Sequence, residues 1–256
     1  MAKGTTIDWA EQGDKISKCI RKSTSGKKEA VHKLRVTIKK TRSLLALVEG
    51  TKSRKSSLGK YLSYIDLVYI PTGKYRDLQI FEALLKKEKS QQARVVEKLI
   101  RHKKTKRKKE MKSALRHFPF DAFQQVSKEF NQTQKNRSST LLDQNATRLI
   151  RNEKSKIKKA LRSGRKPKNL HEIRKHLKTI KGLLEWKNDD KSLKKIHDTE
   201  QFIGEWHDMD LLVMKMKKWK NKKSGEAIQG RFISSLERKN NKHITPLLKM
   251  IRNAIL

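Results

Sequence analysis

The sequence predicts an all-α protein built from two helical bundles. Glycine and proline are sparse, at 11 and 4 of 256 residues, so few positions interrupt a helix. Apolar residues recur at helical spacing over long stretches, whereas the strict alternation of a half-buried strand is almost absent. The third observation is a pair of motifs that occurs in the same order in both halves of the chain, as an internal duplication would produce.

The first motif is a basic helix. VHKLRVTIKK at 31–40 and LHEIRKHLK at 170–178 share the pattern apolar-His-x-apolar-Arg-x-x-apolar-Lys. Apolar or small side chains in and after each motif fall on one helical stripe: Leu34, Ile38, Thr41, Leu45 and Val48 in the first copy, and Ile173, Leu177, Ile180 and Leu184 in the second. Each stripe predicts a helix with one buried face.

The second motif is a short stretch that begins with glycine. It reads GKYRDLQI at 73–80 and GEWHDMDLL at 204–212, and we interpret each copy as the join between two helices. The two copies lie 139 residues apart at the histidine motif and 131 residues apart at the glycine motif, a drift that an eight-residue loop difference explains. We therefore expect a first repeat over residues 1–135 and a second over 136–256, with the polar stretch NQTQKNRSST at 131–140 as the linker.

The charge of the chain predicts a polyanionic partner. There are 65 Lys and Arg residues against 26 Asp and Glu, a formal charge of +39, and self-repulsion of that size disfavours a compact state unless an anion is bound. Nucleic acid, an anionic membrane and a condensed phosphate polymer all fit this requirement. The lone Cys19 suits a reducing compartment, and neither a signal peptide nor an apolar run of membrane-spanning length is present, so we expect a soluble cytoplasmic protein.

The basic side chains of the repeated helix form a row. Taking the histidine as position i, basic residues stand at i, i+3, i+7 and i+10, within an arc of roughly 80°. They are His32, Arg35, Lys39 and Arg42, which we call the first ridge, and His171, Arg174, Lys178 and Lys181, which we call the second ridge. A solvated face of a basic protein could also carry such a row. Its recurrence in identical register, beside the buried stripe, favours an anion-binding surface instead.

The two motifs, their order and their spacing resemble the CHAD (conserved histidine α-helical) domain family over nearly the whole chain. The resemblance implies a pair of helical bundles related by pseudo-twofold symmetry around a basic groove or pore. It also implies that the eight ridge residues bind inorganic polyphosphate without catalysis. Attachment to polyphosphate granules in the cytoplasm, phosphate sensing and recruitment of a partner are alternative purposes of that binding. Phosphate or sulfate is then expected to fit the same site, and no cofactor is implied.

Other residues of the motifs have secondary roles in this interpretation. Arg76 and His207 are candidate additional ligands, and Asp77 and Asp208 are expected to orient a basic side chain or to cap the following helix. Two features depart from the family pattern: Lys181 stands where the family usually has Arg, and Glu185 lies one turn beyond the second ridge. The basic run RHKKTKRKK at 101–109 is interpreted as a solvated or partly disordered arm.

Three other functions are less consistent with the sequence. Metal binding is disfavoured because arginine, not a metal ligand, stands at i+3 of both ridge histidines. His207 and Asp210 have ligand spacing, but no third ligand lies near them in the sequence. Catalysis lacks a nucleotide-binding glycine motif, and no Glu is followed by another Glu two positions on, as the E-x-E-x-K motif of triphosphatase domains requires. The basic helices lack the aromatic and leucine face that membrane insertion needs.

Sequence-independent nucleic-acid binding remains the alternative, because attraction to phosphate ignores base sequence. Aromatic residues make up 6% of the chain, and no aromatic lies between the histidine and the last cation of either ridge. Lys outnumbers Arg by 47 to 18, which favours phosphate contacts over bidentate base recognition. The sequence does not specify polyphosphate chain length, oligomeric state or biological purpose.

Overall fold

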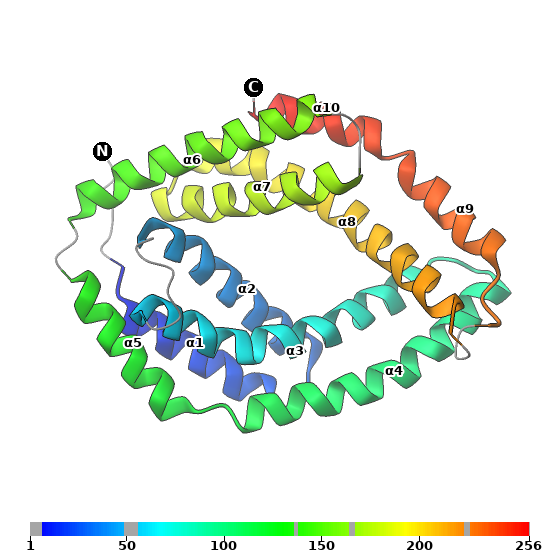
Figure 1. The fold of residues 1–256 in the computed structure, drawn as a ribbon, viewed down its shortest axis with the longest axis horizontal. Coiled ribbons are helices and arrows are strands. Elements are labelled where there is room, and N and C mark those ends of the chain that lie inside the picture. The colour runs from blue at the N-terminus through cyan, green and yellow to red at the C-terminus, as the bar shows by residue number, and fades with distance from the viewer. Residues whose placement is uncertain (1–6, 49–55, 136–137, 164–166, 223–225, 256) are drawn as a thin grey trace. The chain divides into compact units, whose positions relative to one another are not determined.

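The protein is all-helical, as predicted. The structure is a computed structural model that describes residues 7–48, 56–135, 138–163, 167–222 and 226–255 (Figure 1). Across these ranges the regular elements are helices, and no strand occurs. None of the described helices is both long enough and apolar enough to cross a membrane.

The helices follow one another with short connections. The first part of the chain contains α1 (Trp9–Ser23), α2 (Lys28–Leu45), a 3-10 turn η1 (Ala46–Val48), α3 (Ser57–Leu85), α4 (Gln91–Arg116) and α5 (Phe120–Gln134). The second part contains α6 (Ser139–Arg162), α7 (Pro167–Lys187), α8 (Asp190–Lys220), α9 (Gly230–Asn241) and α10 (Ile244–Ile255).

The two glycine motifs do not join helices. Gly73 lies inside α3, with Pro71 two residues before it, and Gly204 lies inside α8. Proline costs about 3 kcal/mol and glycine about 1 kcal/mol inside a helix, but buried side chains on both sides of these positions favour a continuous helix. In α3 they include Val68 and Tyr75, and in α8 Ile203 and Trp206.

One further expectation holds only in part, and another was wrong. The connection between α5 and α6 lies within the predicted linker at 131–140 but is shorter, because α5 continues to Gln134 and α6 begins at Ser139. Residues 101–109 are not an arm but a regular part of α4. Their charges are partly offset there: Lys104 and Arg101 pair with Glu82, and Arg107 pairs with Glu110.

The chain folds into two compact units, each built from separate segments. The first unit comprises Met1–Arg76, Arg107–Asn152 and Gly182–Asp190, and the second comprises Asp77–Lys106, Glu153–Lys181 and Lys191–Leu256. The duplication with a boundary near residue 135 and the pseudo-twofold symmetry stay predictions.

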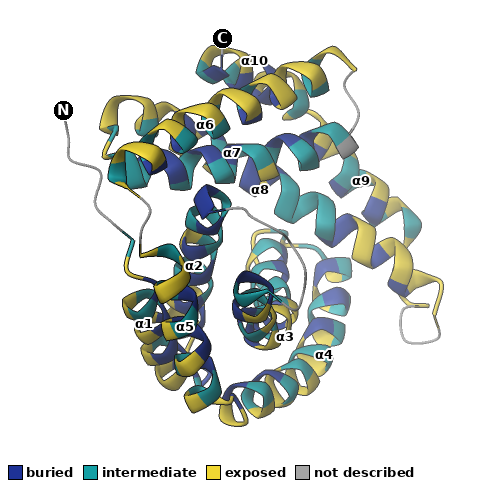
Figure 2. Ribbon diagram, turned by 60° about the vertical axis from the view of Figure 1, so that its left-hand side comes forward, coloured by how far each residue is buried: buried dark blue, intermediate teal, exposed yellow. Residues whose placement is uncertain are grey.

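Aromatic side chains dominate the core of the first unit. Helix α1 packs against α2 and α5, and Trp9, Tyr61, Phe123 and Phe130 stack at centroid distances of 5.1–6.3 Å. The stripe of α2 joins this core, since Leu34 and Ile38 are fully buried. Figure 2 shows this burial along the helices.

The second unit has its own apolar core. It gathers side chains from α3, α4, α8 and α9, among them Phe81, Ile100, Met216 and Leu236. The stripe of α7 is buried as predicted, with Ile173 and Leu177 inaccessible to solvent. Burial of these stripes fixes which face of α2 and of α7 carries the ridge.

Candidate anion-binding ridges

The first ridge lies on α2 at the border of its buried face. Arg35, Lys39 and Arg42 are half-buried, and His32 is exposed. The neighbouring positions Leu34 and Ile38 hold the helix in the core. The ridge therefore borders the apolar stripe, as its sequence register predicts.

Arg35 is held by the middle of α3. Its Nη1 donates to the carbonyl oxygen of Tyr69 at 2.8 Å and lies 3.5 Å from the Thr72 hydroxyl. Its guanidinium carbon also lies 4.4 Å from the centre of the Tyr69 ring, a cation–π contact. These partners are uncharged, so they fix the side chain without neutralising it.

Gly73 makes room for this arrangement. A Cβ atom at this position would lie 2.8 Å from Arg35 Nη1, closer than real side chains approach. The glycine of the second motif thus allows the arginine of the first motif to lie against α3.

Arg42 shares the same aromatic ring. Its guanidinium carbon lies 4.4 Å from the centre of the Tyr69 ring, and its Nη2 pairs with the carboxylate of Asp66. Burial lowers the pKa of Arg42, Arg35 lowers it further, and Tyr69 opposes the shift. Since arginine has so high an ordinary pKa, the group still carries its charge at neutral pH.

His32 lies in a strongly positive environment. Partial burial lowers its pKa from 6.5, and so do Arg76, Lys39, Arg35 and Lys28. Both causes act in the same direction, so the imidazole is mainly uncharged at neutral pH. Arg76, a secondary candidate, thus acts electrostatically on the ridge histidine.

The second ridge begins with a hydrogen-bonded chain. His171 Nε2 lies 2.9 Å from an Asp210 carboxylate oxygen, and its Nδ1 lies 2.5 Å from Nδ1 of His207. A carboxylate accepts, so His171 donates from Nε2; in the neutral imidazole Nδ1 then accepts, and His207 Nδ1 is the donor. His207, the other secondary candidate, is therefore also beside the histidine of its ridge.

Glu200 lies between two cations of the second ridge. Its Oε1 is 3.9 Å from Arg174 Nε, and its Oε2 is 3.7 Å from Lys181 Nζ. Gly204 again stands opposite the ridge arginine, but a Cβ there would lie 3.4 Å from Arg174 Nη2, an ordinary contact distance. In each unit, the arginine at i+3 lies against the glycine of the following long helix.

Comparison with known proteins identifies the family. The CHAD domain model matches residues 9–217, most of the chain. The chain belongs to the CHAD domain family. A solved structure, the crystal structure of the CHAD domain from the plant Ricinus communis, superposes with a TM-score of 0.67 at 13% identity, covering 99% of this chain and 95% of that one. A search of curated proteins found no match.

The remaining predicted residues of this CHAD domain are placed as follows. Lys39 and Lys178 are half-buried on their ridges. Asp77 and Asp208 lie in the interior of α3 and α8, so the expectation that they cap a helix is wrong, while an orienting role stays a prediction. Glu185, one turn beyond the second ridge, pairs with Lys40 at 2.9 Å.

The structure brings His171 into contact with both His207 and Asp210, the pair for which the sequence offered no third metal ligand. The two histidine Nδ1 atoms are 2.5 Å apart, too close to hold a metal ion between them. Within the described ranges no group of three His, Cys, Asp or Glu residues could hold a metal ion.

Several residues that contact the ridges were not predicted from the sequence, among them Tyr69 and Glu200. Each of these two stands four residues before its motif glycine, Gly73 or Gly204, and so one helical turn away on the same face. The matching positions of Tyr69 and Glu200 follow from the sequence only if each glycine motif lies inside a helix rather than between two helices.

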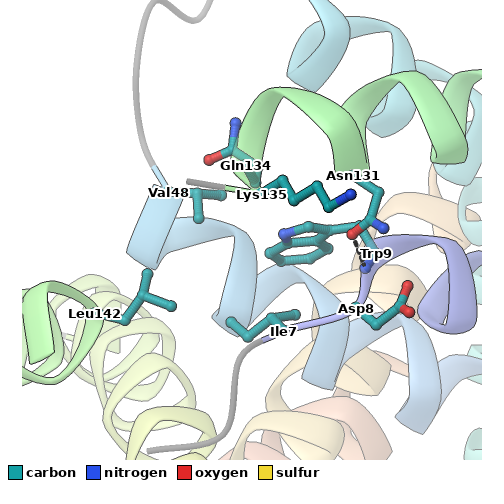
Figure 3. Close-up of a pocket in the computed structure, with 8 residues that line it drawn as sticks. All are labelled: Ile7, Asp8, Trp9, Val48, Asn131, Gln134, Lys135 and Leu142. Carbon is teal, nitrogen blue, oxygen red and sulfur yellow. Dashed lines mark hydrogen bonds between the residues drawn. The ribbon is translucent and has the colours of Figure 1, made fainter. Parts of the chain in front are cut away.

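A cavity of about 200 Å³ in the first unit lies apart from these residues (Figure 3). At its wall the Trp9 backbone N–H donates to Asn131 Oδ1 at 2.9 Å. Its lining contains no ridge residue and consists of Ile7, Asp8, Trp9, Val48, Asn131, Gln134, Lys135 and Leu142. The cavity is thus distinct from the predicted anion site.

Proposed function

We propose that this CHAD domain binds inorganic polyphosphate through its two ridges, without a catalytic step of its own. The ligand is a linear anion with a charge on every phosphate unit. Successive ridge cations lie one helical turn apart, about 5–6 Å between their Cβ atoms. A flexible phosphate chain can follow such a row, whereas a single phosphate or sulfate ion satisfies only part of it.

The observation that carries the proposal is the environment of His32. Partial burial lowers the pKa of the His32 imidazole, and four cations, Arg76, Lys39, Arg35 and Lys28, lower it further. Their mutual repulsion disfavours the folded state, and a bound polyanion would relieve it. The nearest partners of Arg35 are an aromatic ring, a carbonyl and a hydroxyl, which leave its charge available for a ligand.

The ridge histidines fit a supporting role in this proposal. An uncharged imidazole donates one hydrogen bond to a phosphate oxygen, and a neighbouring polyanion favours its protonated form, which donates two. Binding is therefore expected to strengthen as pH falls from about 8 to 6. The cellular counterpart of this activity would be attachment of a cytoplasmic protein to polyphosphate granules.

Titration tests the proposal against nucleic-acid binding. Long-chain polyphosphate, single-stranded DNA and duplex DNA are each titrated into the full chain at several salt concentrations. Affinity for all three should fall with salt, because counterions are released in every case. Polyphosphate should retain measurable binding at physiological salt after DNA binding is lost. Tighter binding of DNA at that salt would contradict the proposal.

A further inference from the structure

The two ridges differ at equivalent positions of the helices that hold them. Four residues before the motif glycine, the first unit has Tyr69 and the second has Glu200. Six residues after it, the first unit has Gln79 and the second has Asp210. At both positions a neutral residue in the first copy corresponds to a carboxylate in the second.

Tyr69 fixes two cations without offsetting them. Its ring centre lies 4.4 Å from the guanidinium carbons of both Arg35 and Arg42. A stacked guanidinium is covered on one face, while its N–H edge can still donate to an anion. Tyr69 thus holds the i+3 and i+10 cations of the first ridge without adding a charge of its own, while Arg42 also pairs with Asp66.

Glu200 takes the same place with a negative charge. Its two oxygens face Arg174 and Lys181, the i+3 and i+10 cations of the second ridge, at 3.9 and 3.7 Å. The Glu200 side chain is 16% exposed, so solvent screens its charge only weakly. A phosphate group that contacts both cations would have to compete with this carboxylate.

The first ridge has a carboxylate too, but it is hydrogen-bonded to Arg42 and not to Arg35. Asp66 pairs with Arg42, and its side chain is 44% exposed, against 16% for Glu200 and 18% for Asp210. Greater exposure means stronger screening by water and salt. Glu200 and Asp210 are thus more shielded from solvent than Asp66 is.

We propose that Glu200 is an affinity-determining residue that acts as an internal anion on the second ridge, so that the first ridge is the tighter phosphate site. The inference rests on the proposed function and deepens it. A phosphate group entering the second ridge must compete with Glu200 for Arg174 and Lys181. Tyr69 imposes no such competition on the first ridge.

The decisive variant is Glu200→Gln, which keeps the shape of the side chain and removes its charge. Its matched control is Glu205→Gln, since Glu205 is an exposed residue on the same helix and its replacement changes the net charge equally. Tripolyphosphate and long-chain polyphosphate are titrated calorimetrically into each full-length variant, with circular dichroism melting to verify folding. We expect Glu200→Gln to tighten binding roughly tenfold and Glu205→Gln less than about twofold.

Introducing a carboxylate at the equivalent position of the first ridge tests the same inference independently. Tyr69→Glu places a carboxylate beside Arg35 and Arg42, and Leu67→Glu, at a site 52% exposed on the same helix, is the control of equal charge. Tyr69→Glu should weaken binding at least tenfold more than the control.

The outcomes separate the two proposals. Wild-type protein that binds no polyphosphate overturns both the proposed function and this inference. Wild-type protein that binds polyphosphate while Glu200→Gln and Glu205→Gln behave alike overturns only the inference.

Discussion

Replacing Gly73 with alanine should separate stability from ligand binding. Inside a helix, alanine is more favourable than glycine by about 0.8–1.0 kcal/mol of intrinsic helix propensity. The added Cβ would lie 2.8 Å from Arg35 Nη1, so the guanidinium must move away from the Tyr69 carbonyl that it contacts at 2.8 Å. A hydrogen bond from a charged group contributes about 1.5–3 kcal/mol, less where water can replace the partner. The free energy of unfolding should therefore fall by about 0–2 kcal/mol.

Ligand binding should respond more strongly than stability. Displacement of Arg35 removes a charged hydrogen-bond donor from the first ridge, which is worth roughly 1.5–3 kcal/mol of binding free energy. Polyphosphate affinity of Gly73→Ala should therefore fall about 10- to 100-fold.

Gly204→Ala is the matched control in the second unit. A Cβ there meets Arg174 Nη2 at 3.4 Å, an ordinary contact, so the guanidinium can stay in place. This variant should gain about 0.8–1.0 kcal/mol of stability from helix propensity and should bind polyphosphate within about twofold of the wild type. Urea unfolding and calorimetric titration measure both quantities. Equal losses of binding in the two variants, or no loss in Gly73→Ala, would refute the assigned role of Gly73.

Two pH-dependent predictions follow from the described ionisable groups. Because burial and neighbouring cations lower its pKa, His32 should titrate below 6.5 in an NMR experiment on the free protein, and polyphosphate should raise that value; a free-state pKa at or above 6.5 would contradict the environment described. Burial disfavours the charged form of Glu153, but hydrogen bonds from Lys156 and His176 outweigh it and lower the Glu153 pKa below 4.5. Its stabilising contribution is therefore present above pH 4.5 and lost as pH falls through the lowered pKa. Glu153→Gln should destabilise the protein at pH 7 and flatten the acid side of its stability profile in urea titrations, and an unchanged profile would count against this pair.

Periodicity made the two ridge helices predictable. The buried stripes of α2 and α7 repeat at helical spacing, and burying Leu34 or Ile173 fixes the face on which the neighbouring basic side chains emerge. The residues within each ridge could be identified for this reason, since they belong to one helix.

Contacts between different helices could not be predicted from local sequence patterns. Pro71 and Gly73 predict an interruption from intrinsic propensity, but packing on both sides of them keeps α3 continuous. Tyr69 and Glu200 reach their ridges from a different helix, and no local spacing links them to Arg35 or Arg174. Their role becomes visible only when α3 lies against α2 and α8 against α7.

The most direct test of the central claim is a pair of charge reversals that change the net charge equally. Arg35→Glu with Arg174→Glu changes both ridges, whereas Lys106→Glu with Lys109→Glu changes two exposed residues of α4. If the ridges bind polyphosphate, the first pair should weaken its binding at least roughly tenfold more than the second, because ridge charges contact the ligand and exposed charges are screened within about 8–10 Å. Equal losses from the two pairs, measured by titration with long-chain polyphosphate at physiological salt, would contradict the claim and indicate a nonspecific polycation.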